Sequence, residues 1–291
     1  MRDVSVELCG LRLAHPVVNG SGTFDAIAAL TVFGEQLIER FPFAAYVSKT
    51  ITLQPRAGNP PPRLWEAPAG LINSIGLPNR GLTGYIEHDL PLLARLPAPL
   101  ITNVMGSTAH ELAALVAACE QRAEISAIEL NVSCPNVKTG LDIGSDPRQL
   151  ESVCAQVREA TSKPLIVKLT PNTADVAACA EAAQAGGADA VSLINTLRAM
   201  ALAPRTRQPW LGGGTGGLSG PAVRAVALAQ VAAVARRVQI PVIGMGGVQT
   251  VAHARDLLHA GASLIAVGSE SFRDPLAAAR IAEALAESSH G

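Results

Sequence analysis

The sequence predicts a single α/β domain over residues 1–291, a (β/α)8 (TIM) barrel with an N-terminal hairpin and long insertions at the C-terminal face. Short apolar runs rich in β-branched residues recur eight times and mostly alternate with helix-like segments. The chain is 48% hydrophobic but only 3% aromatic, so Ala, Val, Leu and Ile must fill the core. An open Rossmann-like sheet is the alternative, but no GxGxxG opens a helix near the N-terminus.

The elements follow in order from the N-terminus. Residues 4–8 alternate, Cys9-Gly10 forms a turn and residues 11–13 return, which predicts a small hairpin. Barrel strands are predicted at residues 16–19, 45–48, 100–104, 127–131, 165–169, 190–194, 241–244 and 263–267. Helices are predicted at residues 109–122, 147–161, 173–185, 221–237 and 250–260. Gly186-Gly187 and Gly261 stand where helix C-caps are expected.

Two segments interrupt this rhythm, residues 50–99 and residues 198–219. Both are too long for ordinary βα loops, and the first is rich in proline and glycine. Long insertions on a barrel usually build the active site or its lid. An oligomer contact is the alternative, and the two roles are compatible.

Composition excludes several classes of protein. The formal net charge is −1 and there is no block of Lys or Arg, which argues against a nucleic-acid or polybasic membrane surface. No apolar run reaches the roughly 18 residues that span a bilayer. The first residues lack the apolar core of a signal peptide. We therefore expect a cytoplasmic enzyme with no nucleic-acid or membrane partner.

The cysteine and histidine patterns indicate neither a disulfide framework nor a metal site. The five cysteines are irregularly spaced without a CxxC, and the six histidines form no HxxxH. Cys119, Cys154 and Cys179 lie in helical Ala/Val patterns, so we expect core thiols.

A polar hexapeptide, Asn131-Val132-Ser133-Cys134-Pro135-Asn136, follows the fourth predicted strand. Its thiol can take or give one proton, although a lone cysteine is more often a small buried hydrophobe. The other strand ends supply the context that favours chemistry, because all of them deliver polar or glycine residues to the catalytic face of a barrel. These residues are Gly20-Ser21-Gly22-Thr23, Lys49-Thr50, Asn103, Lys168, Asn195-Thr196, Gly246-Gly247 and Gly268-Ser269.

Glycine loops after the last two predicted strands indicate a phosphate site. Gly246-Gly247 and Gly268-Ser269 each precede a predicted helix, where backbone N–H groups can bind a dianion. Residues 216–220, directly before Pro221, offer a third such loop, and ordinary turns are the alternative. A phosphate-bearing ligand such as flavin mononucleotide (FMN) is expected. Lys49 and Lys168, if buried, need anionic partners, which a flavin edge and a substrate carboxylate would supply.

Seven segments together resemble dihydroorotate dehydrogenase, over about residues 4–275 and in the expected order. They are residues 21–24, 55–60, 73–77, 131–136, 194–196, 216–220 and 244–247. Cysteine rather than serine at the base position resembles the class 1 enzymes. The Asn-Pro-rich segment after Lys49 and the sequence Gly-Gly-Leu-Ser-Gly-Pro at 216–221 look most like class 1B, the NAD-linked form.

The resemblance implies roles at matching positions. Cys134 would be the catalytic base. The FMN-binding residues would be Ser21, Lys49, Thr50, Asn103, Asn131, Lys168, Ile194, Gly220, Gly246, Gly247, Gly268 and Ser269. The substrate-binding residues would be Lys49, Asn73, Ser74, Ile75, Gly76, Leu77, Asn131, Asn195 and Thr196. Ser269 stands where the family often has Thr and keeps the hydroxyl, whereas Leu141 replaces the second glycine of a frequent pair.

The implied reaction is the oxidation of dihydroorotate to orotate in pyrimidine biosynthesis. Cys134 would take the C5 proton and FMN N5 the C6 hydride, and the loop after Cys134 would close over the substrate. The chain has neither an iron–sulfur motif nor a dinucleotide fingerprint. The resemblance therefore implies an electron-transfer subunit carrying FAD and a [2Fe-2S] cluster, besides a homodimer.

Three alternatives stay open from the sequence. One is a class 1A enzyme that reduces fumarate, and another is a related FMN barrel that acts on a different pyrimidine. The third is a non-catalytic flavin-binding or scaffold protein, against which the combination of Cys134, Lys49 and Asn195 counts.

Overall fold

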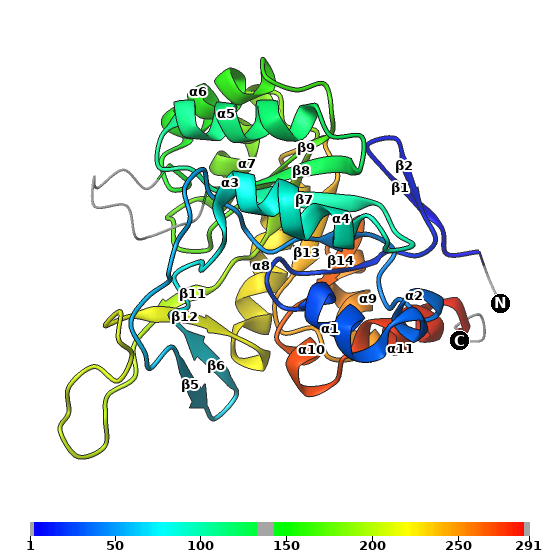
Figure 1. Ribbon diagram of the computed structural model, residues 1–291. Coiled ribbons are helices and arrows are strands. Elements are labelled where there is room, and N and C mark those ends of the chain that lie inside the picture. The colour runs from blue at the N-terminus through cyan, green and yellow to red at the C-terminus, as the bar shows by residue number, and fades with distance from the viewer. Residues whose placement is uncertain (1–2, 133–142, 288–291) are drawn as a thin grey trace.

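A computed structural model describes residues 3–132 and 143–287. Its central sheet has eight strands in the order β3-β14-β13-β10-β9-β8-β7-β4, and every hydrogen-bonded pair is parallel (Figure 1). The predicted barrel is confirmed, with strand limits within about two residues of those expected. The strands are β3 (Val17–Asn19), β4 (Tyr46–Val47), β7 (Leu100–Val104), β8 (Ile125–Asn131), β9 (Leu165–Lys168), β10 (Ala190–Leu193), β13 (Val242–Met245) and β14 (Leu264–Val267).

The side chain of Asn19 links the two ends of this strand order, β3 and β4. Its Nδ2 donates to the Val47 carbonyl at 2.8 Å, and its Oδ1 accepts from the Val47 N–H at 2.7 Å. An amide side chain thus reproduces the donor–acceptor pair that a backbone ladder would supply. The barrel is therefore closed at this seam largely by one buried asparagine.

Helices surround the barrel, and side-chain caps explain where several begin. Thr108, Asp146, Asp175 and Thr250 each accept a hydrogen bond from a backbone N–H of the first turn. The helix expected at 173–185 therefore starts only after Asp175. The one expected at 221–237 begins with a 3-10 turn, η2 (Pro221–Val223). The helices are α1 (Ala26–Phe33), α2 (Glu35–Glu39), α5 (Ala109–Glu120), α6 (Pro147–Arg158), α7 (Val176–Ala185), α8 (Arg224–Ala235), α9 (Val251–His259), α10 (Glu270–Arg273) and α11 (Ala277–Glu287).

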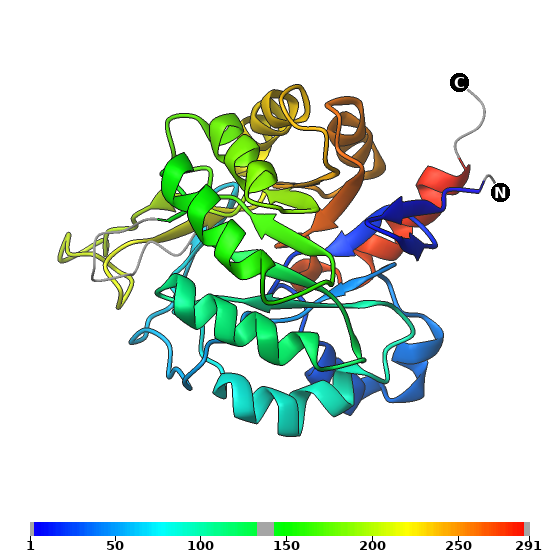
Figure 2. The same cartoon turned by 90° about the horizontal axis from the view of Figure 1, so that it is seen from above.

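The predicted hairpin of β1 (Val6–Leu8) and β2 (Leu11–Leu13) covers the N-terminal end of the barrel (Figure 2). Leu8 and Leu13 are each only 1% exposed and join the cluster of side chains that fills the barrel interior. The turn between the strands places Cys9 at φ 49° and Gly10 at φ 83°, which two-residue hairpins of the primed type require. The predicted core thiols Cys119, Cys154 and Cys179 are all buried.

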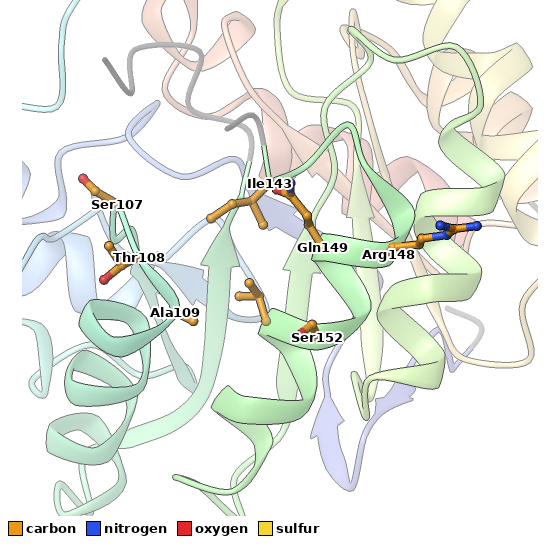
Figure 3. Close-up of a pocket in the computed structure, with 8 residues that line it drawn as sticks. Ser107, Thr108, Ala109, Ile143, Arg148, Gln149 and Ser152 are labelled. Carbon is orange, nitrogen blue, oxygen red and sulfur yellow. The ribbon is translucent and has the colours of Figure 1, made fainter. Parts of the chain in front are cut away.

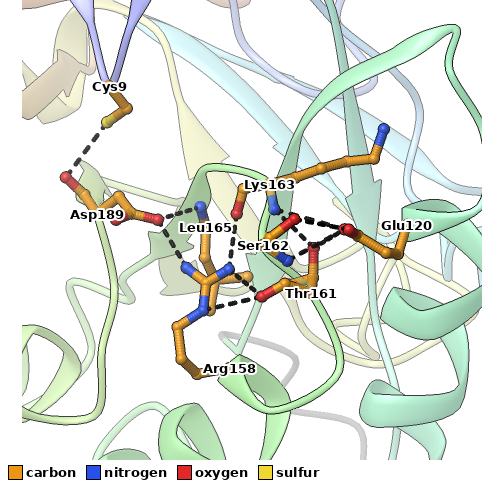
Figure 4. A network of polar contacts seen from close by, with 8 residues as sticks. All are labelled: Cys9, Glu120, Arg158, Thr161, Ser162, Lys163, Leu165 and Asp189. Carbon is orange, nitrogen blue, oxygen red and sulfur yellow. Dashed lines mark hydrogen bonds and ion pairs between the residues drawn. The ribbon is translucent and has the colours of Figure 1, made fainter.

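Polar side chains around the start of β9, at the N-terminal end of the barrel, form a network of hydrogen bonds (Figure 4). Arg158 donates to the Asp189 carboxylate at 2.8 Å and to the carbonyls of Thr161 and Lys163. Asp189 also accepts from the Leu165 N–H, at 2.8 Å, where β9 begins. The network fixes the loop that enters β9.

The two insertions form one structure that sequence analysis did not predict. Their strands make a four-stranded antiparallel sheet in the order β11-β12-β6-β5, on the side of the molecule away from the hairpin (Figure 1). The strands are β5 (Leu64–Ala67), β6 (Gly70–Asn73), β11 (Leu197–Ala199) and β12 (Gly216–Ser219). Residues 216–219, expected as a glycine loop, are therefore a strand. The first insertion continues through α3 (Gly81–Gly84), a π-helical turn η1 (Tyr85–Asp89) and α4 (Leu90–Leu93).

Candidate active site at the carboxyl ends of the strands

Side chains from three strand ends meet through hydroxyl and amide groups. Ser21, after β3, donates to the Ser48 carbonyl at 2.8 Å and lies 3.5 Å from the Thr50 hydroxyl. Asn131, the last residue of β8, donates to the same hydroxyl at 3.4 Å. Three residues expected to bind the cofactor are thus brought together, although they lie up to 110 positions apart in the chain.

The two lysines expected at this face differ in their surroundings. Lys168 ends β9 and is only 6% exposed, and no described residue forms an ion pair or hydrogen bond with its ammonium group. Lys49 is exposed, so the argument from burial applies to Lys168 and not to Lys49. A buried cation without a partner is unfavourable and indicates an anionic ligand at Lys168.

Asn103, inside the barrel on β7, is fully buried. Its Nδ2 donates to the Glu129 carboxylate of β8, and the other carboxylate oxygen accepts from Ser192 of β10 at 3.0 Å. The remaining polar atom, Asn103 Oδ1, has no hydrogen-bond partner among the described residues. An unmatched buried acceptor costs roughly 1–3 kcal/mol, so a donor from a bound molecule fits here.

The predicted glycine loops lie together at the ends of β13 and β14. Gly246 and Gly247 have φ values of 131° and 68°, which only glycine adopts readily. A Cβ at Gly268 would meet only a methyl carbon of Thr23, at 3.8 Å, so the backbone there borders open space. Ser269 donates to Ser219 of β12 at 2.7 Å, which ties the inserted sheet to this corner.

Ile194 and Gly220 serve these glycine loops structurally. Ile194 is 3% exposed and its N–H donates to the Met245 carbonyl at 3.0 Å. Gly220, with φ 89°, precedes the 3-10 turn, and a Cβ there would come within 2.9 Å of Gly70. Both positions shape the backbone around the expected phosphate site.

The residues expected to hold the substrate lie on and beside the inserted sheet. Asn73 ends β6 and donates to the Gly217 carbonyl at 3.2 Å, while Ser74 accepts from Asn59 at 2.9 Å. Ile75 and Gly76 follow, and Leu77 has a left-handed φ of 55°. On the barrel side, the Asn195 amide oxygen accepts from the Thr196 N–H at 2.8 Å. The role of the insertions in the site therefore stays a prediction, with Asn73 and Ser74 bonded to other residues of the insertions.

The predicted base, Cys134, lies outside the described residues, as does Leu141. Burial raises the pKa of the other thiols: to about 11 for Cys9 and to about 12 for Cys119 and Cys154. These three cysteines therefore stay protonated near neutral pH and are poor proton acceptors.

A cavity of about 420 Å³ lies between the starts of α5 and α6, and Ile143 contributes to its wall (Figure 3). Ser107 and Thr108 border it on one side, and Gln149 and Ser152 on the other. None of the predicted site residues lines it. Among the residues described, no group of His, Cys, Asp and Glu could hold a metal ion.

Sequence reasoning missed Glu129, Ser192, Asn19 and Ser219. Glu129 lies in the strand predicted at residues 127–131, and a charged residue in a buried strand is the signal that could have singled it out. The other three are small polar residues at strand or turn positions, where sequence alone does not distinguish a site from a turn.

Comparison with known proteins agrees over nearly the whole chain. The sequence profile of the family described as Dihydroorotate dehydrogenase matches residues 3–288. The "Dihydroorotate dehydrogenase B (NAD(+)), catalytic subunit" of Pelobacter propionicus is 44% identical, with 97% of this chain and 92% of that protein covered. The protein of the same description from Geobacter sulfurreducens is 45% identical, with 96% and 91% covered.

A solved structure supports the fold. The crystal structure of DHODH in complex with ferulenol from Eimeria tenella superposes with a TM-score of 0.79 at 22% identity, covering 97% of this chain and 83% of that one. In the described part of the chain, no helix is both long and apolar enough to cross a membrane.

Proposed function

Because the chain belongs to the dihydroorotate dehydrogenase family, we propose that its strand-end site binds FMN and dihydroorotate and oxidises the latter to orotate. The chain is the catalytic subunit of a dihydroorotate dehydrogenase of class 1B, the NAD-linked form, which is an oxidoreductase of pyrimidine biosynthesis. The observation that carries the assignment to this site is the buried Lys168 at the end of β9, which has no anionic partner among the described residues.

The described residues fit FMN on three counts. Lys168 offers a positive charge for the pyrimidine edge of the flavin, and Asn103 Oδ1 offers an acceptor for a ring N–H. The positive φ values of Gly246 and Gly247 and the open space beside Gly268 support a phosphate site at the backbone N–H groups after β13 and β14. Ser21, Thr50 and Asn131, which contact one another at the ends of β3, β4 and β8, would complete the cradle.

FMN, when bound, supplies the acceptor for the hydride from C6 of dihydroorotate. The chain itself contributes positioning and proton transfer. We assign the substrate carboxylate and ring to residues 73–77, with Asn131, Asn195, Thr196 and Lys49. Cys134 takes the C5 proton, which requires a local environment that lowers its pKa from near 8.5.

The name of its relatives, catalytic subunit, supports a separate electron-transfer subunit. We propose that this partner carries FAD and a [2Fe-2S] cluster, because this sequence has neither motif. We also propose a homodimer of the catalytic chain, which gives a heterotetramer, and a cytoplasmic location.

Anaerobic mixing of the purified yellow protein with dihydroorotate tests the assignment. We expect the flavin absorbance to bleach and orotate to appear in equal amount. Absence of bleaching in protein with stoichiometric FMN would reject the function.

The variant Cys134→Ala tests the proposed base, and Cys154→Ala is the matched control because Cys154 is a buried thiol in α6. We expect Cys134→Ala to slow bleaching by about 10²–10⁴-fold, the usual range for general base catalysis, while FMN stays bound. Bleaching at the normal rate would remove Cys134 from this role.

A further inference from the structure

Glu129 is a buried carboxylate inside the barrel. It is 2% exposed and lies on β8 between Ala127 and Asn131. Ala127 belongs to the cluster that fills the barrel interior, whereas Ile128 and Leu130 pack with the helices. Since strand residues alternate between faces, Glu129 points into the barrel, one layer below Asn131.

Both carboxylate oxygens of Glu129 are committed to neighbours. One accepts from Asn103 Nδ2 on β7, and the other from Ser192 Oγ on β10 at 3.0 Å. Strand β9 lies between β8 and β10, so the bond to Ser192 crosses β9 inside the barrel. No Lys, Arg or His in the described part of the chain forms an ion pair with Glu129. Burial of a carboxylate that has hydrogen bonds but no ion pair costs free energy of folding, and such groups are typical of functional sites.

Glu129 determines which way the Asn103 amide faces. A carboxylate only accepts hydrogen bonds, so it must face the NH2 group of Asn103 and not the carbonyl. Asn103 Oδ1 is consequently directed elsewhere, and it is the atom left without a donor. The ring of oxidised FMN carries a single N–H group, at N3, which is the donor this acceptor matches.

Lys168 belongs to the same stretch of the barrel interior. In register it pairs with Ser192, the second partner of Glu129, and with Asn131. The ammonium and the carboxylate do not form an ion pair with each other. Two opposite buried charges therefore act at short range on whatever binds above them, the cation stabilising added negative charge and the anion opposing it.

We propose that Glu129 is a positioning residue for the flavin. It holds Asn103 with its carbonyl toward the N3–H of the ring, and its negative charge lowers the reduction potential of the bound cofactor by opposing the charge that Lys168 stabilises. The inference rests on the proposed binding of FMN at this face.

The variant Glu129→Gln removes the charge but keeps the size of the side chain. Its amide can accept or donate, so Asn103 is no longer held in one orientation. The matched control is Thr102→Val on the same strand as Asn103. Thr102 is fully buried and hydrogen bonded to Tyr85 at 2.8 Å, and it points to the helix side of β7. The control removes a buried hydrogen bond without touching Glu129 or Asn103.

Two measurements on FMN-loaded protein test the proposal. The first is the midpoint potential of the flavin in an anaerobic redox titration. The second is the exchange rate of the N3 proton by NMR with ¹⁵N-labelled FMN. In Glu129→Gln we expect the midpoint potential of the flavin to rise by about 30 mV. For a two-electron couple, this rise corresponds to a tenfold increase in the ratio of reduced to oxidised flavin at a fixed potential. We also expect N3–H exchange to be at least tenfold faster. Thr102→Val should change neither.

Unchanged potential and exchange in Glu129→Gln with stoichiometric FMN would overturn the proposal. If that variant does not fold, Glu129→Asp replaces it, because it keeps the charge and shortens the reach to Asn103. Its N3–H should exchange faster while the potential stays near that of the wild type, and unchanged exchange would overturn the positioning role. Failure of the wild-type protein to retain FMN would contradict the proposed function itself and is distinguishable from both results.

Discussion

The two ends of the barrel differ in whether their buried polar groups have partners. At the N-terminal end, Arg158 and Asp189 are joined at 2.8 Å within a satisfied network, and two leucines of the hairpin close the interior. At the C-terminal end, the described part of the chain supplies neither an anion for the buried Lys168 nor a donor for Asn103 Oδ1. The first arrangement stabilises the fold by itself, whereas the second is complete only with a ligand. The comparison therefore locates stability at one end and function at the other.

Among substitutions at the N-terminal end of the barrel, Leu8→Ala should cause the largest loss of stability. Leu8 is 1% exposed in the interior cluster, so its truncation leaves a cavity and should lower the free energy of unfolding by about 3 kcal/mol. Urea denaturation measures this effect. FMN stoichiometry and the rate of bleaching by dihydroorotate should not change, with the half-buried Leu11→Ala as the milder control. A loss of FMN without a loss of stability would contradict the division between the two ends.

Lys168→Met, at the C-terminal end, should lower the reaction rate without lowering the stability. Removal of the cation should slow bleaching by dihydroorotate about 100-fold, because charge developing on the flavin loses its stabilising partner. The free energy of unfolding of the FMN-free protein should stay equal or rise, since an unpaired buried charge is replaced by an apolar chain.

The control for Lys168→Met is a lysine at the opposite end. Lys163 donates to the carbonyls of Arg122 and Ile125 at 2.7 and 2.6 Å. Lys163→Met should lower stability and leave the bleaching rate unchanged. Equal effects of the two substitutions on the rate would show that the charge of Lys168 has no special role.

Arg158→Lys tests whether the polar network at the N-terminal end contributes to stability alone. Lysine keeps the charge but cannot reproduce the forked contacts to Asp189, Thr161 and Lys163, so we expect a loss of about 1–2 kcal/mol in the free energy of unfolding. Thermal unfolding at a fixed FMN concentration measures the change. A slower reaction at unchanged stability would be the contrary result.

Cys9→Asn should have the smallest effect, and a favourable one. Cys9 adopts φ 49° in the hairpin turn, a conformation that asparagine tolerates better than other side chains. The contact of its thiol with the Asp189 carbonyl at 3.3 Å is lost, so the net gain should be about 0.5 kcal/mol. Urea denaturation measures it, and a loss above 1 kcal/mol would mean that the thiol contact outweighs the turn.

The sequence by itself determined the barrel and which residues stand at the carboxyl ends of its strands. The order of apolar runs and helices dictates the strands, because each strand buries both faces, and parallel strands place their carboxyl ends at one edge. Lys168, Asn131 and the glycine pair could therefore be predicted to meet without any coordinates. The resemblance at residues 131–136 and the other segments then predicted the family.

Only the tertiary structure decided which of these groups are paired. Lys49 and Lys168 look alike in the sequence, yet Lys49 is exposed, whereas Lys168 is buried and no described residue supplies it with an anion. The inserted sheet joins residues 64–73 to residues 197–219. Pairing between segments so far apart in the chain cannot be predicted from a local pattern of apolar residues. Glu129 bonds across the barrel interior, and Asn19 bonds across the seam between β3 and β4, so closure of the sheet determines the partners of both. Hydrogen-bond partners between distant strands are a property of the closed barrel, and no spacing along the chain encodes them.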